Sequence, residues 1–154
     1  MSALTEGNPK VLIAIDGVTN PQNLGMIIRS VTASPCYGLL LPTKGVAEIS
    51  SLVIKASAGT VFKGTILRCD SLPTALKKLQ QQGFKLCMLS SQDATPLSDI
   101  PRDQSVVYIL GNESDGVSES IASLCDYRAG IAMNNGVESL NVAVTAALVA
   151  FTAV

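Results

Sequence analysis

The chain of 154 residues contains no histidine. Histidine is the usual general base near neutral pH and the commonest metal ligand in proteins. Its absence excludes serine–histidine and cysteine–histidine catalysis, and a transition-metal site is not expected. Two phosphate-binding motifs are also missing, because no GxGxxG follows the first apolar run and no GxxxxGK[ST] occurs anywhere.

Charge is scarce. Only 15% of the residues are charged, the formal net charge is −1, and 47% are hydrophobic. A chain of this kind does not hold nucleic acid by bulk charge, so any basic surface has to be local. The balance is typical of a globular α/β core, or of a protein that hides surface in an oligomer.

Signals for export, disulfides and membranes are missing too. The first ten residues lack the apolar core of a signal peptide, and the apolar run over 142–154 is too short to span a bilayer. The cysteines form no CxxC pair, which favours buried thiols in a reducing compartment. We expect a cytoplasmic protein without membrane or metal partners. The four cysteines are Cys36, Cys69, Cys87 and Cys125.

Apolar runs alternate with segments of helical periodicity along the whole chain. This alternation predicts one α/β domain over residues 1–154, with a mostly parallel sheet and helices on both faces. In such sheets, ligands bind beyond the carboxyl ends of the strands. Strands are expected at 11–16, 37–41, 64–69, 84–90, 105–111 and 127–133, and helices at 23–33, 45–59, 71–83, 116–125 and 138–153.

The first polar segment is DGVTNPQNLGMIIRS, residues 16–30. Apolar residues at 24, 27, 28 and 31 share one helical face, whereas Gly25 and Arg29 lie on another side. Asn23 is expected at the N-cap. Alone, the pattern favours a solvated arginine over a guanidinium that holds a phosphate or carboxylate.

The second polar segment, ILGNESDGVSES, covers residues 109–120. Gly111 would let backbone donors reach an adenine or a ribose, and Glu113 can orient a polar group. The same letters also fit a turn at Asp115-Gly116 and a helix capped by Ser118.

The third segment is GVESLNVAV, residues 136–144, at the start of the last predicted helix. Glu138 or Ser139 can cap this helix, whose positive end favours an acid. Capping does not explain Asn141, a mediocre helix former. Asn141 therefore needs a specific partner.

Together, the three segments resemble the motifs of the SpoU-type (TrmH-like) RNA ribose methyltransferases of the SPOUT superfamily. The matching stretches are NPQNLGMIIRS, LGNESDGVS and IAMNNGVESLNVAV, with KASAG (55–59) between the first two. The resemblance runs from about residue 11 to 151, which is almost the whole chain.

The resemblance implies an α/β fold with a deep trefoil knot near the C-terminus, a homodimer, and an RNA substrate. The implied reaction moves a methyl group from S-adenosylmethionine to a ribose 2′-hydroxyl of tRNA or rRNA. Guanosine is the expected nucleotide. Arg29 would be the central catalytic residue, supported by Asn23, Glu113, Ser139 and Asn141. Because guanidinium groups stay protonated in proteins, Arg29 suits a phosphate anchor better than a base. The residues expected to hold the cofactor are Ser90, Leu110, Gly111, Asn112, Ile131, Met133, Ser139 and Leu140.

Some features depart from the family pattern. Relatives often carry proline where Ala132 stands and serine where Ala143 stands, and many have an N-terminal RNA-binding domain that we do not expect here. The candidates for a local RNA-binding face are Lys44, Lys55, Lys63, Arg68, Lys77 and Lys78.

Two other functions stay open at this point. One is an α/β module that binds a nucleotide or another cofactor without methyl transfer, and the other is a methyltransferase-like protein that binds RNA without turnover. The sequence also leaves the RNA and its nucleotide open. The candidates are a guanosine in tRNA, a nucleotide in large-subunit rRNA and, ranked lower, the tRNA wobble position.

Overall fold

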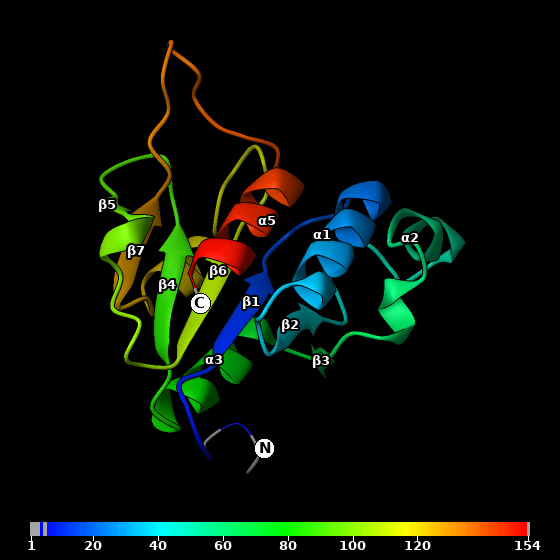
Figure 1. Cartoon of the computed structure of the whole chain (residues 1–154), viewed down its shortest axis with the longest axis horizontal. Helices are drawn as coiled ribbons and strands as arrows, with labels where there is room; N and C mark the ends of the chain where they lie inside the picture. Colours follow the sequence, from blue (N-terminus) through cyan, green and yellow to red (C-terminus); the bar gives the residue numbers. More distant parts are fainter. Residues whose placement is uncertain (1–3, 5, 154) are drawn as a thin grey trace.

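The computed structural model describes Leu4 and residues 6–153, so the extreme ends of the predicted 1–154 domain lie outside the described residues. The described strands form one sheet in the order β3-β2-β1-β6-β4-β7-β5, and every neighbouring pair is parallel (Figure 1). The strands are β1 (Val11–Ile15), β2 (Gly38–Pro42), β3 (Ile66–Cys69), β4 (Lys85–Leu89), β5 (Thr95–Pro96), β6 (Val106–Leu110) and β7 (Tyr127–Gly130).

Helices cover both faces of this sheet, as the alternating pattern predicts. One core cluster joins alternate residues of the central strands to α1 and α5, and the other joins the remaining strand residues to α3 and α4. The knot implied by the family resemblance stays a prediction. The helices are α1 (Pro21–Ala33), α2 (Ser51–Ala56), α3 (Leu72–Gln81), α4 (Glu119–Ala122) and α5 (Val142–Thr152), with the 3₁₀ helices η2 (Thr60–Phe62) and η3 (Leu97–Asp99).

The two central strands explain why the sequence contains unbroken apolar runs. β1 reads VLIAI and β6 reads VVYIL, and all ten residues are buried. They pair in register from Val11 with Val106 to Ile15 with Leu110. A strand covered by helices on both faces has no solvent side, so polar residues appear only where it ends.

The predicted helix over 45–59 is wrong in its first half. Only Ser51–Ala56 is helical, with Ser50 at the N-cap. The Ala47 N–H donates to the Val18 carbonyl and not to a carbonyl of a helical turn. This hydrogen bond ties the loop to the residues that follow β1. The prediction failed because this contact spans residues that are distant in sequence.

Two other helices begin later than predicted, and one short strand was not predicted. The helix predicted at 116–125 begins only at Glu119, and the helix predicted at 138–153 begins at Val142. Ser118 holds the N-cap position of α4, but its side chain makes no capping hydrogen bond. The predicted loop after β4 contains a two-residue edge strand, β5, in which Pro96 lacks an N–H without harming the sheet.

All four cysteines are free, as expected, but only Cys87 is buried and the other three are half-buried. Burial is the largest cause of their raised pKa values, and it raises the pKa of Cys87 to about 12. Thiols of this kind are poor nucleophiles, and they serve as small packing groups. None of the described helices is long and apolar enough to cross a membrane.

Gly25 lies on the face of α1 that packs against α2. A β-carbon at this position would lie 2.5 Å from Ala56 Cβ, 2.8 Å from the Val53 carbonyl oxygen and 2.9 Å from Ser57 N. The space beside this glycine is therefore filled by α2, not by a ligand.

Gly25→Ala should lower the free energy of unfolding by about 1–3 kcal/mol, because the methyl group forces α1 and α2 apart. Helix propensity alone predicts the opposite sign, since alanine is the better helix former by about 1 kcal/mol. Urea unfolding followed by circular dichroism measures the change, with Gln22→Ala at an exposed position of α1 as the control. A Gly25→Ala protein as stable as wild type would contradict the packing described.

Candidate functional site

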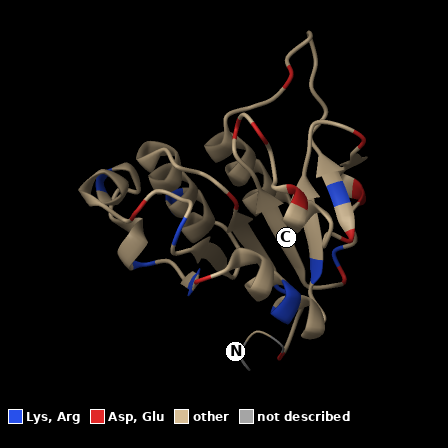
Figure 2. Ribbon diagram, turned by 180° about the vertical axis from the view of Figure 1, so that it is seen from behind, with Lys and Arg blue, Asp and Glu red and all other residues tan. Residues whose placement is uncertain are grey.

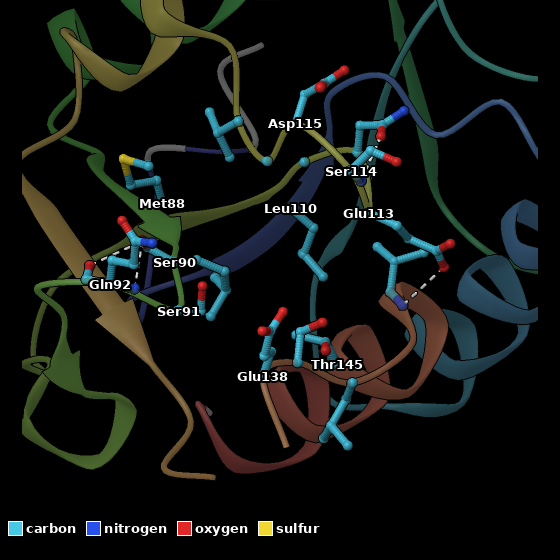
Figure 3. A pocket seen from close by; sticks show the side chains of 18 of the residues that line it. Met88, Ser90, Ser91, Gln92, Leu110, Glu113, Ser114, Asp115, Glu138 and Thr145 are labelled. Carbon is cyan, nitrogen blue, oxygen red and sulfur yellow. Dashed lines mark hydrogen bonds between the residues drawn. The ribbon is translucent and has the colours of Figure 1, made fainter. Parts of the chain in front are cut away.

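A cavity of about 460 Å³ opens at the carboxyl ends of β4, β6 and β7 (Figure 3). The three strands are parallel neighbours, so the segments that follow them meet at one edge of the sheet. The walls are residues 88–92, residues 110–117, part of the 131–140 segment and the first turns of α5. A volume of this size suits a small-molecule cofactor.

The residues expected to hold a cofactor gather in this cavity. They come from three segments that are far apart in the sequence, and Leu110 lies in the middle of the lining between them (Figure 3). The cavity is lined by all eight of them: Ser90, Leu110, Gly111, Asn112, Ile131, Met133, Ser139 and Leu140.

Glu113 joins the first, second and third polar segments. Its Oε1 accepts hydrogen bonds from Asn23 Nδ2 at 3.1 Å, from Asn141 Nδ2 at 3.2 Å and from the backbone N–H of Val142 at 3.4 Å. Val142 is the first residue of α5, where the helix dipole favours a negative charge. One carboxylate oxygen therefore fixes the start of α5 against α1 and the loop after β6.

Asn141 uses both ends of its amide. Its Oδ1 caps α5 by accepting from Ala143 N at 2.8 Å and from Val144 N at 3.4 Å. Its Nδ2 donates to Glu113 Oε1 and to Asn23 Oδ1, the latter at 3.2 Å. The expectation of a specific partner for Asn141 is therefore right. Two related predictions are wrong: Asn141 does cap α5, and neither Glu138 nor Ser139 is the N-cap.

Asn23 does not cap α1 as predicted. The N-cap is Asn20, whose Oδ1 accepts from Gln22 N at 2.9 Å and from Asn23 N at 3.0 Å, with Pro21 at the first helical position. The Asn-Pro pair carried this signal in the sequence, since proline is favoured at that position. Asn23 is thereby free to turn its side chain toward Glu113.

Residues that follow β1 anchor the loop that carries Glu113. Asn112 Nδ2 donates to the Gly17 carbonyl at 3.0 Å, and the Ser118 N–H donates to Asp16 Oδ2 at 2.7 Å. Within the loop, Asn112 and Gly116 exchange both backbone hydrogen bonds. The loop is thus a small closed turn anchored at both ends.

Gly111 is also required by the fold of its own loop. A β-carbon there would lie 2.1 Å from the Gly116 carbonyl carbon and 2.2 Å from Val117 N. Gly116 and Val117, at the end of the same loop, are the residues that approach Gly111 so closely. Gly111 lines the cavity because the loop folds back so tightly.

Arg29 is not among the residues that line this cavity. It is exposed on α1 and has no hydrogen bond or salt bridge within the described part of the chain. Ser139, in contrast, lines the cavity, and Asn23 and Asn141 reach it through Glu113. Four of the five predicted catalytic residues therefore belong to one cluster, and Arg29 does not.

The lining is acidic. It contains the carboxylates of Glu113, Asp115 and Glu138, and it contains no lysine or arginine. Such a rim favours a cationic ligand and disfavours one with bare phosphates. Across the described residues, no three His, Cys, Asp or Glu side chains gather as a metal site would require.

Sequence reasoning missed several lining residues. Gln92 follows β4 and is held by Ser90, whose hydroxyl accepts from Gln92 N at 3.1 Å and donates to its carbonyl at 3.0 Å (Figure 3). Thr145 lies one turn into α5 and lines the same cavity as Glu138. The rule that ligands sit beyond strand ends would have found Gln92, but nothing in the sequence marked Thr145.

A family model for the SpoU rRNA Methylase family matches residues 10–151. The chain belongs to the SpoU rRNA methylase family. An uncharacterised tRNA/rRNA methyltransferase of Mycobacterium leprae is 32% identical over 149 residues, which is 97% of this chain and 48% of that protein. A similar protein of Mycobacterium tuberculosis is also 32% identical, with 97% of this chain and 46% of that protein covered. The chain spans about half the length of these curated relatives.

Solved structures show the same fold. The SpoU methyltransferase AviRb from Streptomyces viridochromogenes, in complex with AdoMet, has a TM-score of 0.87 at 24% identity, covering 99% of this chain and 62% of that one. An AdoMet-bound rRNA methyltransferase from Sinorhizobium meliloti has a TM-score of 0.86 at 25% identity, covering 97% of this chain and 59% of that one. The observed α/β architecture is therefore that of the family.

The two functions of Asn141 can be separated by substitution. Asn141→Ser keeps an oxygen that can cap α5 but loses the amide donors, whereas Asn141→Ala loses both. We expect Asn141→Ala to be less stable than Asn141→Ser by about 1 kcal/mol, the usual worth of a cap. Urea unfolding measures the difference, and exposed Asn134→Ala is the control. Equal stability of Asn141→Ala and wild type would rule out the capping role.

Proposed function

We propose that the chain is an S-adenosylmethionine-dependent RNA methyltransferase that methylates a ribose 2′-hydroxyl of tRNA or rRNA, with guanosine as the favoured nucleotide. The observation that carries the proposal is the cavity formed largely by the second and third segments that match the family motifs. It joins the loop after β6 to the segment before α5 through Glu113.

The cavity suits S-adenosylmethionine in size and charge. Leu110, Ile131, Met133 and Leu140 provide apolar lining for the adenine, and Gly111 would bring backbone groups to the ribose. The acidic rim complements the positive sulfonium and ammonium groups. NAD and FMN carry phosphates and would meet these carboxylates without any lysine or arginine in the lining.

The bound cofactor would supply an activated methyl group. The protein would then have to hold the ribose oxygen in line with that group, and a rigid site does this best. Glu113, Asn23 and Asn141 form the rigid part, because each is hydrogen-bonded to the other two. Ser139 lines the cavity without a hydrogen bond to any described residue, so its hydroxyl is available to the substrate or the cofactor.

Arg29 would act on the RNA rather than on the cofactor. Its position outside the cavity and its exposed guanidinium suit a bidentate contact with a phosphate. Because guanidinium groups stay protonated, Arg29 would anchor the nucleotide and polarise the hydroxyl instead of taking its proton.

Methyl transfer itself is tested by incubating the protein with isotopically labelled S-adenosylmethionine and total RNA. Mass spectrometry of the nuclease digest then maps the label. We expect a methylated nucleoside whose mass increase stays with the ribose on fragmentation. A label on the base would disprove ribose specificity, and no label in any RNA would disprove the proposed activity.

Arg29→Ala should retain the cofactor affinity of wild type but lose most of the turnover, by about 100-fold or more, since RNA positioning is lost. Arg29→Lys keeps the charge without the planar fork and should lie between the two. Calorimetry measures the cofactor affinity, and label incorporation measures the rate. Normal methylation by Arg29→Ala would show that the assignment is wrong.

The outer surface of α5 supports the predicted homodimer. Val144, Leu148 and Phe151 are spaced four and three residues apart, share one face, and are 44%, 38% and 53% exposed. A helix that is apolar all round is normally buried on all sides. In one chain only the inner side of α5 is covered, mainly by α1 and the sheet. A second copy would cover the outer face.

Wild type should therefore elute with twice the chain mass in size-exclusion chromatography with light scattering. Leu148→Glu places a charge in the expected interface and should shift the protein toward monomer. Leu52→Glu, at an exposed position of α2, is the matched control and should leave the mass unchanged. A monomeric wild type, or a dimer insensitive to Leu148→Glu, would refute this interface.

A further inference from the structure

Charge is unevenly divided along the chain. Residues 17–69 contain five lysines and arginines and one acid, whereas the rest of the chain contains six cations and eleven acids. Residues 17–69 form α1, β2, α2, η2 and β3, which lie together at one end of the sheet (Figure 1). Figure 2 shows mainly blue segments on this end and most of the red segments elsewhere. A protein of net charge −1 thus has one end with an excess of positive charge, where a polyanion is attracted.

The same end carries the two most exposed of the large apolar side chains that the structure describes. Phe62 is 77% exposed and Leu52 is 63% exposed, more than any other large hydrophobic residue among those the structure describes. Phe62 is one of only three phenylalanines in the chain. It is flanked in sequence by exposed Lys63, and exposed Lys55 lies on the helix that precedes it.

Phe62 stands on a rigid corner rather than on a loose loop. Its N–H donates to the Gly59 carbonyl at 3.2 Å, and Gly59 takes the left-handed φ of 77° that ends the turn after α2. The Thr60 hydroxyl donates to the carbonyl of Ser57 at 2.7 Å, and Ser57 is fully buried. Both α2 and η2 pack against α1. The backbone that carries the exposed ring is therefore held in place by these contacts.

We propose that Phe62 is a stacking platform for an unpaired base of the RNA substrate, with Lys55 and Lys63 contacting the neighbouring phosphates. Single-stranded RNA is commonly recognised by aromatic side chains beside a positive surface, because every base offers a flat face. This inference rests on the proposed RNA methyltransferase function and adds the place where the RNA is held outside the cavity. The surface is distinct from the outer face of α5, since α1 lies between α2 and α5 (Figure 1).

Three substitutions separate stacking from simple hydrophobicity. Phe62→Ala removes the side chain, Phe62→Leu keeps an apolar group without a ring, and Phe62→Trp keeps a ring. The probe is a fluorescein-labelled single-stranded RNA of mixed sequence, titrated by anisotropy at low salt. We expect Phe62→Ala and Phe62→Leu to weaken binding by about 10-fold, and Phe62→Trp to bind at least as tightly as wild type. The KM for RNA should rise in the first two variants, while kcat and the affinity for S-adenosylmethionine stay unchanged.

Tryptophan also provides a direct signature, because the wild-type chain has none. The fluorescence of Phe62→Trp should be quenched when RNA stacks on the indole. Tyr127→Trp, on β7 toward the other end of the sheet, is the control and should not be quenched. Circular dichroism checks that each variant is folded.

The possible failures are distinguishable. A wild-type protein that neither binds nor methylates RNA would remove the proposed function and this inference together. A wild type that methylates RNA, with Phe62→Ala and Phe62→Leu binding RNA as wild type does, would overturn the stacking platform alone. A change of oligomeric mass in Phe62→Ala with unchanged RNA affinity would also overturn it and would assign the surface to a protein contact.

Discussion

One carboxylate oxygen, Glu113 Oε1, connects the parts of the molecule that form the site. It receives N–H donors from α1, from the residue that caps α5 and from the first residue of α5. These segments lie 90, 28 and 29 residues away from it in sequence. Hydrogen bonds to a charged acceptor are worth more than neutral ones, so they fix the approach of α5 to the cavity. They act together with the buried face of α5, which packs against α1.

The parallel sheet makes this convergence possible. Because β4, β6 and β7 run in the same direction, the polar loops that follow them meet above one edge. The sheet also needs an interior that excludes water, and the apolar residues of the central strands provide it. The molecule thus divides its tasks by position: strands provide the core, strand ends provide the cavity, and the end that carries β3, β2, α1 and α2 provides positive charge.

The sequence predicted the architecture because burial leaves periodic traces. Runs such as VLIAI and VVYIL indicate strands with two covered faces, and the eight residues expected around a cofactor do line the cavity. Contacts between distant segments left no such trace. The 45–50 stretch is a loop because Ala47 bonds Val18, and Asn141 reaches Glu113 and Asn23 while it caps α5. The catalytic roles of all five predicted residues stay predictions: Arg29, Asn23, Glu113, Ser139 and Asn141.

Calorimetric titration of the wild-type protein with S-adenosylmethionine, NAD and FMN in parallel tests the central claim most directly. An acidic cavity built by the convergence at Glu113 should bind one S-adenosylmethionine per chain and neither of the phosphate-bearing cofactors. Binding of NAD or FMN without binding of S-adenosylmethionine would contradict the account.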